Sequence, residues 1–279
     1  CDGFVSGEAR MLGPLVKHYC ATAHAPALGL ALLLKEKLVS EFYLEDGAYT
    51  IERFQTKHAH SVTCVLSSLA QLAELLDDIP LLLRVKAFYD NGLWRMRNAI
   101  GWSPESTAAP ANQTRGEANN SGDILETALI LGRCGFAEYY HDAERIVRCH
   151  LLPSQLRDVS FIQDPPNPKN EDGLRDVANR HLGAWGFPAP YGHRFPGQKS
   201  LSFNMDIVGG VVGSLCEVCR HIVRRDTTGV WVNLLIDWET ADARVVGLHA
   251  VVGRLIVQGR RRSGYHCLVG PHHSYQHVR

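Results

Sequence analysis

The sequence predicts a mainly α-helical protein whose chain changes to β-strands near its C-terminal end. Apolar residues recur at intervals of three and four over much of the first 225 residues, and breaker residues divide these stretches into pairs. After Asp226 the apolar period changes to two, as in strands. With 279 residues, of which 45% are hydrophobic, the chain can bury a large core.

The charge balance excludes one class of partner. There are 29 Lys and Arg residues against 29 Asp and Glu residues, so nucleic-acid binding by bulk charge is not expected.

The longest apolar run, residues 27–34, is far shorter than the roughly 20 residues of a membrane span, so no membrane partner is expected. The chain begins with Cys1 rather than Met, which suggests that its true start precedes it and leaves the compartment unknown.

The expected helices follow one another as antiparallel pairs. Asp123 is expected to cap the fourth of them, after a polar loop at residues 103–120. The helical patterns cover residues 14–42, 58–76, 80–97, 124–133, 137–152 and 206–225.

Two regions depart from the helical pattern. Residues 160–204 are rich in proline, glycine and aromatic side chains, which favours an ordered segment with a binding role. Strands are expected at residues 230–237, 243–247 and 254–258. The tail, 259–279, has no apolar period and is expected to be irregular; a His-rich metal tract or translation out of frame are the alternatives.

Two carboxyl groups are candidates for chemistry. Glu117 lies between Gly116 and an Asn-rich loop, where a carboxyl group can act as an acid with a tuned pKa. Glu126 lies one turn into the next expected helix and could be a second inward carboxylate. Glycoside hydrolysis needs two carboxyl groups that flank one bond. The alternatives are a solvated loop Glu and a surface Glu stabilised by the helix dipole.

The histidines, aromatics and cysteines allow weaker predictions. His58 and His60 are two apart and lie on different helical faces, so a shared metal site is not expected unless they precede the helix. Loop aromatics such as Trp185 and Tyr191, with polar neighbours such as His193, could stack on sugar rings and bond their hydroxyls. Most of the eight cysteines, the Cys216 and Cys219 pair among them, are expected to pack in apolar helices.

Several strings in order resemble one known family. They are His60-Ser61-Val62, Gly116-Glu117, Leu125-Glu126-Thr127, Tyr139-Tyr140-His141-Asp142-Ala143-Glu144-Arg145, and Val230-Trp231-Val232-Asn233-Leu234. Together these resemble the β-L-arabinofuranosidase-like proteins of glycoside hydrolase family 127, once called DUF1680, over about residues 58–237 at low identity.

The resemblance implies an (α/α)6 toroid of helix hairpins followed by a β-sandwich. Family members are much longer than this chain, so only part of the toroid is expected. The implied division is a toroid domain at residues 1–226, the start of a β-sandwich at 227–258, and the tail.

The resemblance also implies residue roles. Glu117 matches the family's general acid/base, His60 a histidine that lines the sugar pocket, and Glu126 a glutamate that helps to hold zinc. In the family this glutamate belongs to a Glu-Thr-Cys motif, and Ala128 stands here in place of its cysteine. The family's adjacent cysteine pair, one of which is the nucleophile, matches a position near Asp206 and is absent here. We therefore expect no zinc or other cofactor, and Asp206 as the substitute nucleophile or base.

The expected function is hydrolysis of a glycosidic bond in a poly- or oligosaccharide, with Glu117 and Asp206 as catalytic residues. Sugar binding is expected from His60, Glu126, Trp185, Tyr191 and His193. A sugar-binding toroid without catalysis, and a lyase or epimerase that uses His60 and Tyr191 for proton transfer, are the alternatives.

Overall fold

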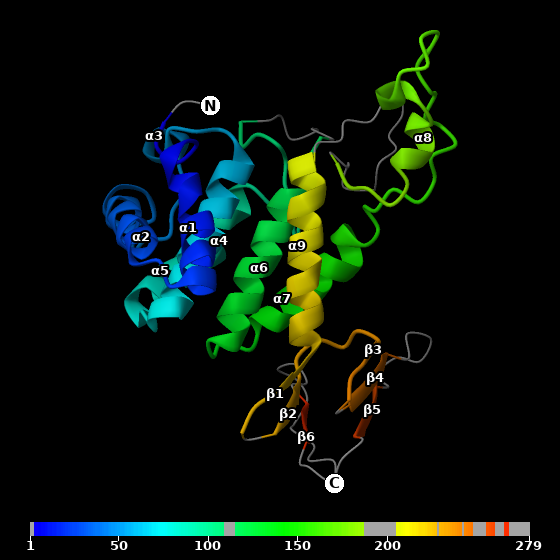
Figure 1. The fold of residues 1–279 in the computed structure, drawn as a ribbon. Coiled ribbons are helices and arrows are strands. Elements are labelled where there is room, and N and C mark those ends of the chain that lie inside the picture. The colour runs from blue at the N-terminus through cyan, green and yellow to red at the C-terminus, as the bar shows by residue number, and fades with distance from the viewer. Residues whose placement is uncertain are drawn as a thin grey trace.

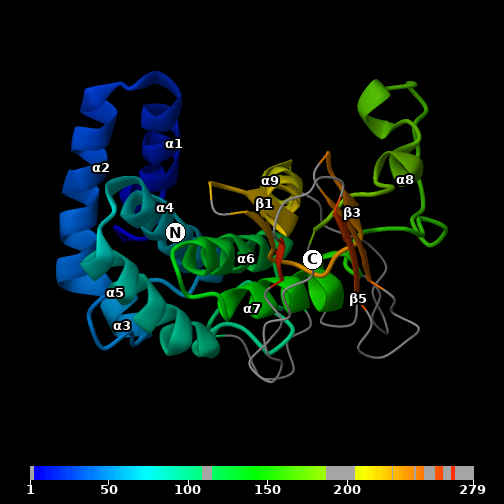
Figure 2. The ribbon, with the colours of Figure 1, turned by 90° about the horizontal axis from the view of Figure 1, so that it is seen from below.

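The computed structural model describes residues 3–108, 115–186, 205–227, 229–241, 243–247, 255–259 and 265–267. Four helices lie side by side, because α1 packs on α4, α4 on α6, and α6 on α9 (Figure 1). A second layer backs this row: α2 packs on α1, α5 on α4, and α7 on α6, as Figure 2 shows from below. The expected succession of helix pairs is therefore present in the described chain.

The helix expected at residues 58–76 is confirmed, whereas the pattern at 14–42 divides at Ala23, which is left-handed with φ of 56°, and the helix expected at 80–97 ends at Asp90. The α-helices are α1 (Leu12–Thr22), α2 (Ala25–Lys37), α3 (Ile51–Phe54), α4 (Ala59–Leu76), α5 (Ile79–Asp90), α6 (Ala118–Arg133), α7 (Tyr139–Ile146), α8 (Val177–Arg180) and α9 (Met205–Ile222). Short 3-10 or π segments are η1 (Glu8–Met11), η2 (Leu38–Phe42), η3 (Gly92–Arg95), η4 (Val147–Leu151) and η5 (Asp172–Leu174).

The turn between α4 and α5 shows how local chemistry sets the bounds. Asp77 ends α4 in the left-handed conformation with φ of 52°. Asp78 then caps α5, since its side chain accepts a hydrogen bond from the Leu81 amide, and Pro80 follows in the first turn, where no amide is needed. Two residues thus reverse the chain and make the two helices antiparallel neighbours.

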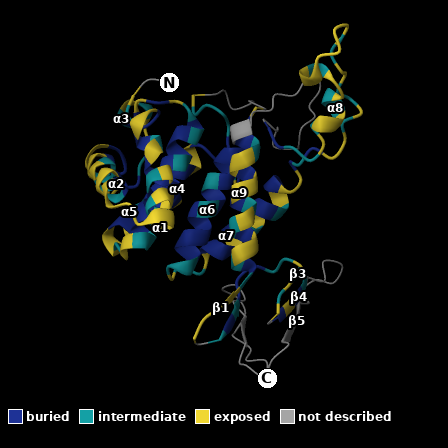
Figure 3. Ribbon diagram, in the orientation of Figure 1, coloured by how far each residue is buried: buried dark blue, intermediate teal, exposed yellow. Residues whose placement is uncertain are grey.

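Helix α4 is almost completely covered by neighbouring elements. Its residues are buried on almost every side (Figure 3), and its neighbours are α1, α5 and α6. Among the described residues it is the one helix with the length and composition of a membrane span, but 67% of it is buried inside the protein, as in a core helix. An aromatic cluster of Phe42, Tyr43, Phe54 and Phe88 fills the space beside it.

The start of α6 corrects the sequence prediction. Asp123 does not cap this helix, because α6 begins at Ala118 and Glu117 occupies the N-cap position. The stretch from Asn119 to Gly122 is typical of a loop but is helical here, because tertiary contacts satisfy its polar groups. The Asn120 amide donates to Ser103 Oγ at 3.2 Å, for example.

The strands lie after α9. One sheet has the order β1-β2-β6 and the other β3-β4-β5. The expected strands near 243–247 and 254–258 are confirmed, whereas the strand expected at 230–237 is shorter, and the tail, expected to be irregular, contains β6. The bounds are β1 (Val223–Arg225), β2 (Val230–Val232), β3 (Trp238–Glu239), β4 (Ala243–Gly247), β5 (Leu255–Gly259) and β6 (Tyr265–Cys267).

Candidate active site

The first turns of α4 and α6 bring the candidate residues together. His58 is the N-cap of α4 and Glu117 is the N-cap of α6, and neither side chain caps its own helix. The loop before α6 is held against α4, because the Ala59 amide donates to the Glu105 carbonyl at 3.1 Å. The two side chains are therefore free to face each other, with His58 Nε2 3.3 Å from Glu117 Oε2.

Gly116 allows Glu117 to reach this position. A Cβ atom at residue 116 would lie 2.4 Å from the Ser103 carbonyl oxygen and 2.6 Å from the Trp102 indole nitrogen. A larger residue would push the loop away, so the glycine permits the close approach of the two backbones. The Gly-Glu pair singled out in the sequence is thus one geometric unit.

The side chain of Glu117 is buried without a hydrogen bond. The residue is 8% exposed, and no hydrogen-bond partner for either carboxyl oxygen is found among the described residues. His58 Nε2 is close to Oε2 but does not form a bond of acceptable geometry. Buried polar groups are normally paired, so an unpaired carboxyl group calls for a functional explanation.

His58 is oriented from its other side. Its Nδ1 lies 2.9 Å from Ser61 Oγ, which forms a chain of polar contacts from Ser61 through His58 to Glu117. The order resembles a nucleophile, base and acid triad. Ser61 is completely buried, however, so its hydroxyl positions the ring and is not offered to a substrate.

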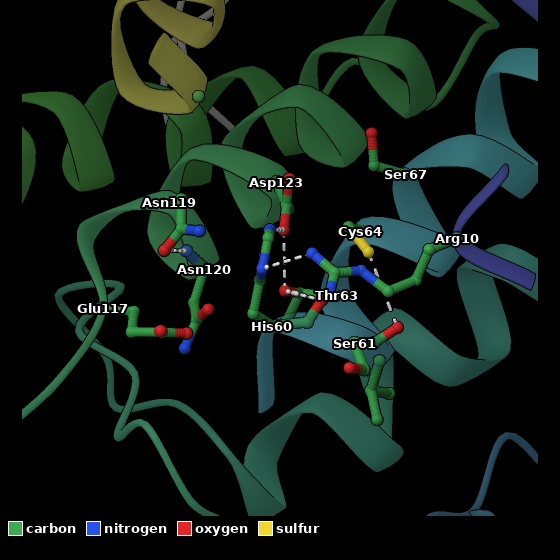
Figure 4. A network of polar contacts seen from close by, with 12 residues as sticks. Arg10, His60, Ser61, Thr63, Cys64, Ser67, Glu117, Asn119, Asn120 and Asp123 are labelled. Atoms are coloured by element: carbon green, nitrogen blue, oxygen red, sulfur yellow. Dashed lines mark hydrogen bonds and ion pairs between the residues drawn. The ribbon is translucent and has the colours of Figure 1, made fainter. Parts of the chain in front are cut away.

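A second polar cluster lies between η1, α4 and α6 (Figure 4). Arg10 Nη2 donates to His60 Nδ1 at 3.2 Å, and Thr63 Oγ1 donates to Asp123 Oδ2 at 2.8 Å. His60 Nε2 lies 3.5 Å from the same Asp123 oxygen. Because an arginine can only donate, His60 Nδ1 accepts, and the proton of the neutral ring is on Nε2, facing Asp123.

Burial sets the protonation of this cluster. Burial, followed by the positive charge of Arg10 and by His58, lowers the pKa of His60 to about 3. Burial also raises the pKa of the Asp123 carboxyl well above its usual range, with a further contribution from Glu126. The Cys64 thiol beside them has a pKa raised to about 12, mainly by burial. His60 is therefore neutral at physiological pH and the thiol is not a nucleophile.

Glu126 makes different contacts from those expected of a partner of Glu117. It accepts a hydrogen bond from Ser67 Oγ at 2.6 Å and lies 3.7 Å from Lys17 Nζ. These partners come from α4 and α1, one turn further along the α4–α6 contact than Thr63 and Asp123. A role of Glu126 in substrate binding stays a prediction.

Three side chains at the starts of α4 and α6 could in principle hold a metal ion. His58, His60 and Glu117 each offer a ligand atom, and these atoms lie within 4.8 Å of one another. The donor chemistry does not fit, because the second nitrogen of His60 faces the Arg10 guanidinium. Histidine ligands usually donate that second proton to an acceptor, and here a cation would also be repelled by Arg10.

The structure describes the other predicted site residues only in part. The Trp185 ring is only 5% exposed and its indole nitrogen donates to the Leu151 carbonyl at 2.8 Å, so its role in sugar binding stays a prediction. Tyr191 and His193 lie outside the described residues. Asp206 is described only by its backbone, in the first turn of α9.

Helix α9 nevertheless places Asp206 near the site. A Cβ at Gly210 would lie 3.2 Å from Asn119 Cβ, and one at Gly122 would lie 2.7 Å from Ser214 Oγ. The two helices therefore run side by side in the same direction, with Gly210 opposite the first turn of α6. Asp206 is one helical turn before Gly210, at the level of the loop that carries Glu117.

The cysteine prediction was wrong for most of the described thiols. Cys216 and Cys219 are exposed on α9, as are Cys20 on α1 and Cys149, whereas Cys64 and Cys134 are half-buried. An amphipathic pattern alone did not show which face of α9 is covered.

The sequence did not predict Arg10, Thr63 and Asp123 as parts of the site. Asp123 was noticed in the sequence, but as the expected cap of a helix and not as part of a site. Arg10 carried no signal, because the contact with His60 joins residues 50 positions apart.

Comparison with solved structures identifies the fold class. The β-L-arabinofuranosidase of glycoside hydrolase family 127 from Geobacillus Stearothermophilus T6 is 14% identical, with a TM-score of 0.55, over 91% of this chain and 46% of that chain. A second GH127 β-arabinofuranosidase is 15% identical, with a TM-score of 0.59, over 94% and 42%. The chain thus has the mainly helical fold of these α/α glycosidases and spans less than half of their length.

A more distant likeness is to an inactive variant of the α-1,6-mannanase GH76A of Salegentibacter sp. HEL1_6 in complex with α-1,6-mannotetrose. It is 14% identical, with a TM-score of 0.45, over 78% of this chain and 75% of that chain. No model of a protein family and no curated protein sequence matches the chain.

Proposed function

We propose that this chain carries the active site of a carbohydrate-active enzyme, a glycoside hydrolase related to the β-L-arabinofuranosidases, in which Glu117 is the general acid/base. The observation that carries the proposal is the buried Glu117 carboxyl group, which has no hydrogen-bond partner among the described residues. Its place on an α/α framework shared with glycosidases supports the same function.

The chemistry requires a proton for the leaving oxygen. A general acid gives this proton to the glycosidic oxygen as the bond breaks, and Glu117 is the carboxyl group proposed for that role. Asp206 is the proposed second carboxyl group, because its place in α9 is at the level of Glu117. If the two groups are about 5 Å apart the anomeric configuration would be retained, and a separation of roughly 6.5–9.5 Å would give inversion.

The substrate is proposed to be a poly- or oligosaccharide. The His58 ring, 3.3 Å from Glu117, could bond a hydroxyl group. The Asn120 amide oxygen is also buried without a partner. Such groups gain hydrogen bonds when a hydroxyl-rich ligand enters.

The test is a screen of the 279-residue chain and its Glu117→Gln and Asp206→Asn variants against a panel of oligosaccharides, beginning with β-L-arabinofuranosides. Proton NMR of the anomeric signals reports both cleavage and its stereochemistry. The proposal expects cleavage by the wild type and a loss of roughly 10²–10⁴-fold in each variant.

Other outcomes separate the alternatives. Oligosaccharide affinity without cleavage would favour a sugar-binding protein, and a product with new ultraviolet absorption would favour a lyase. Undiminished cleavage by the two variants would overturn the assignment of both carboxyl groups.

A further inference from the structure

We propose that His58 is a positioning residue that controls the protonation of Glu117, an inference that rests on the proposed function. The geometry that carries it is the polar chain from the buried Ser61 hydroxyl, through the His58 ring, to the Glu117 carboxyl group. Among the ion pairs of the described residues, His58 is the partner of Glu117.

Glu117 is 8% exposed, so water contributes little to stabilising a charge on its carboxyl group. The His58 imidazole nitrogen 3.3 Å away is the group placed to stabilise it, through its N–H dipole or its positive charge. In the proposed role, His58 assists Glu117 in releasing its proton and recovering it within one catalytic cycle.

The other titratable groups around the pair do not replace His58. On α4, His60 has a pKa lowered to about 3 by burial, so it remains uncharged through the pH range of the assay. On η1, Arg10 contacts the far side of His60. On α6, Asp123 is held by Thr63, with a pKa raised by burial. On α9, Asp206 is the same in the wild type and in the His58 and His141 variants, so it does not account for a difference between them.

Ser61 explains why the ring has this orientation. Its hydroxyl is fully buried and contacts His58 Nδ1 at 2.9 Å, three residues away in the first turn of α4. The ring is thus fixed at one nitrogen by its own helix and presents the other nitrogen to α6. This is the arrangement by which a second contact usually orients a functional imidazole.

The experiment measures kcat/KM against pH for the 279-residue chain on the oligosaccharide that it cleaves. His58→Asn keeps an amide near the place of Nδ1 and loses the group that faces Glu117, whereas His58→Gln keeps an N–H donor near the place of Nε2. His141→Asn, at an exposed position of α7, is the matched control.

The basic limb of the profile reports loss of the acid's proton. It is expected to move to higher pH by about one unit or more in His58→Asn, because the neutral form of Glu117 then persists. A smaller shift is expected in His58→Gln and none in His141→Asn.

A second readout does not depend on activity. The pH midpoint of the His58 ring signals in NMR is expected to be lower in Glu117→Gln than in the wild type, since the carboxylate stabilises the charged ring. This measurement also remains informative if His58→Asn fails to fold.

The failures of the two proposals are distinct. If Glu117→Gln loses activity but the His58 variants keep the wild-type limb, or lose activity equally at every pH, or the NMR midpoint is unchanged, His58 has no control over Glu117 and the inference is overturned. If Glu117→Gln keeps full activity, the proposed function itself is wrong.

Discussion

The buried ion pair between Arg97 and Asp142 gives a sharp test of the packing behind the site. Arg97 Nη1 donates to Asp142 Oδ2 at 2.7 Å, and the two side chains are 2% and 10% exposed. Tyr89 on α5 donates to the same carboxylate, so the network joins α5 to α7. The guanidinium also lies over the rings of Tyr89 and Trp94.

Asp142→Asn removes the charge that compensates Arg97. The guanidinium then stays buried without a counter-ion, and its Nε already has no partner. Breaking such a pair costs about 3–5 kcal/mol of unfolding free energy. At roughly 2–4 °C per kcal/mol for a chain of this size, the melting temperature should fall by about 6–20 °C.

The assay is urea unfolding at pH 7, followed by circular dichroism at 222 nm, for Asp142→Asn, Arg97→Met and the double variant. Replacing both members of a buried pair is often close to neutral, so the double variant should be more stable than either single one. A loss below about 1 kcal/mol in Asp142→Asn would refute the reasoning.

The same pair predicts a pH dependence. Burial acts to raise the pKa of Asp142, but the charge of Arg97 and the hydrogen bonds of Tyr89 and Arg97 outweigh it, so the pKa is lowered from its usual 3.8. The contribution of Asp142 is therefore full above its unfolded-state pKa and is lost as the pH falls through the lower folded-state value. The difference in stability between wild type and Asp142→Asn should begin to shrink as the pH falls below about 4 and should vanish below the folded-state pKa of Asp142.

Three further variants test local features. Gly47→Ala should destabilise the protein by about 3 kcal/mol in the same unfolding assay, because residue 47 has φ of 61° and a Cβ would lie 2.2 Å from the Ala87 carbonyl oxygen. Thr50→Ala should cost about 1 kcal/mol, since Thr50 caps α3 by accepting from the Arg53 amide; a neutral result would show that this cap is dispensable. Cys64 should resist iodoacetamide at pH 8 in mass spectrometry while the exposed cysteines react, because burial raises its thiol pKa to about 12; rapid labelling would contradict that environment.

Local signals were enough to predict most of the helical layer. The period of three and four predicted α4 at residues 58–76, and the helical pattern at residues 80–97 predicted α5, because packing and capping act there on neighbouring residues. The start of α6 could not be predicted in this way. Its Asn119-to-Gly122 stretch is helical because Ser103, Gly101 and Ser214 come from other elements to satisfy or accommodate it.

The residues of the candidate site also divide into those that a local motif predicts and those that only the packing of helices brings together. Gly116 and Glu117 were recognisable as a motif, and the structure adds why the glycine is needed and that the carboxyl group is buried. The approach of His58 to Glu117 and of Arg10 to His60 depends on how η1, α4 and α6 pack, which no spacing in the sequence encodes. Glu126 was expected near Glu117 but contacts Ser67 and Lys17.

The most direct test of the central claim is the dependence of Glu117→Gln on the leaving group. The rates of wild type and variant are compared on an oligosaccharide and on the dinitrophenyl glycoside of the same sugar, whose leaving group needs no proton. A general acid at Glu117 predicts a loss of roughly 10²–10⁴-fold on the oligosaccharide and a much smaller loss on the dinitrophenyl glycoside. Equal losses on both substrates, or no loss on either, would contradict the assignment of Glu117 as the proton donor.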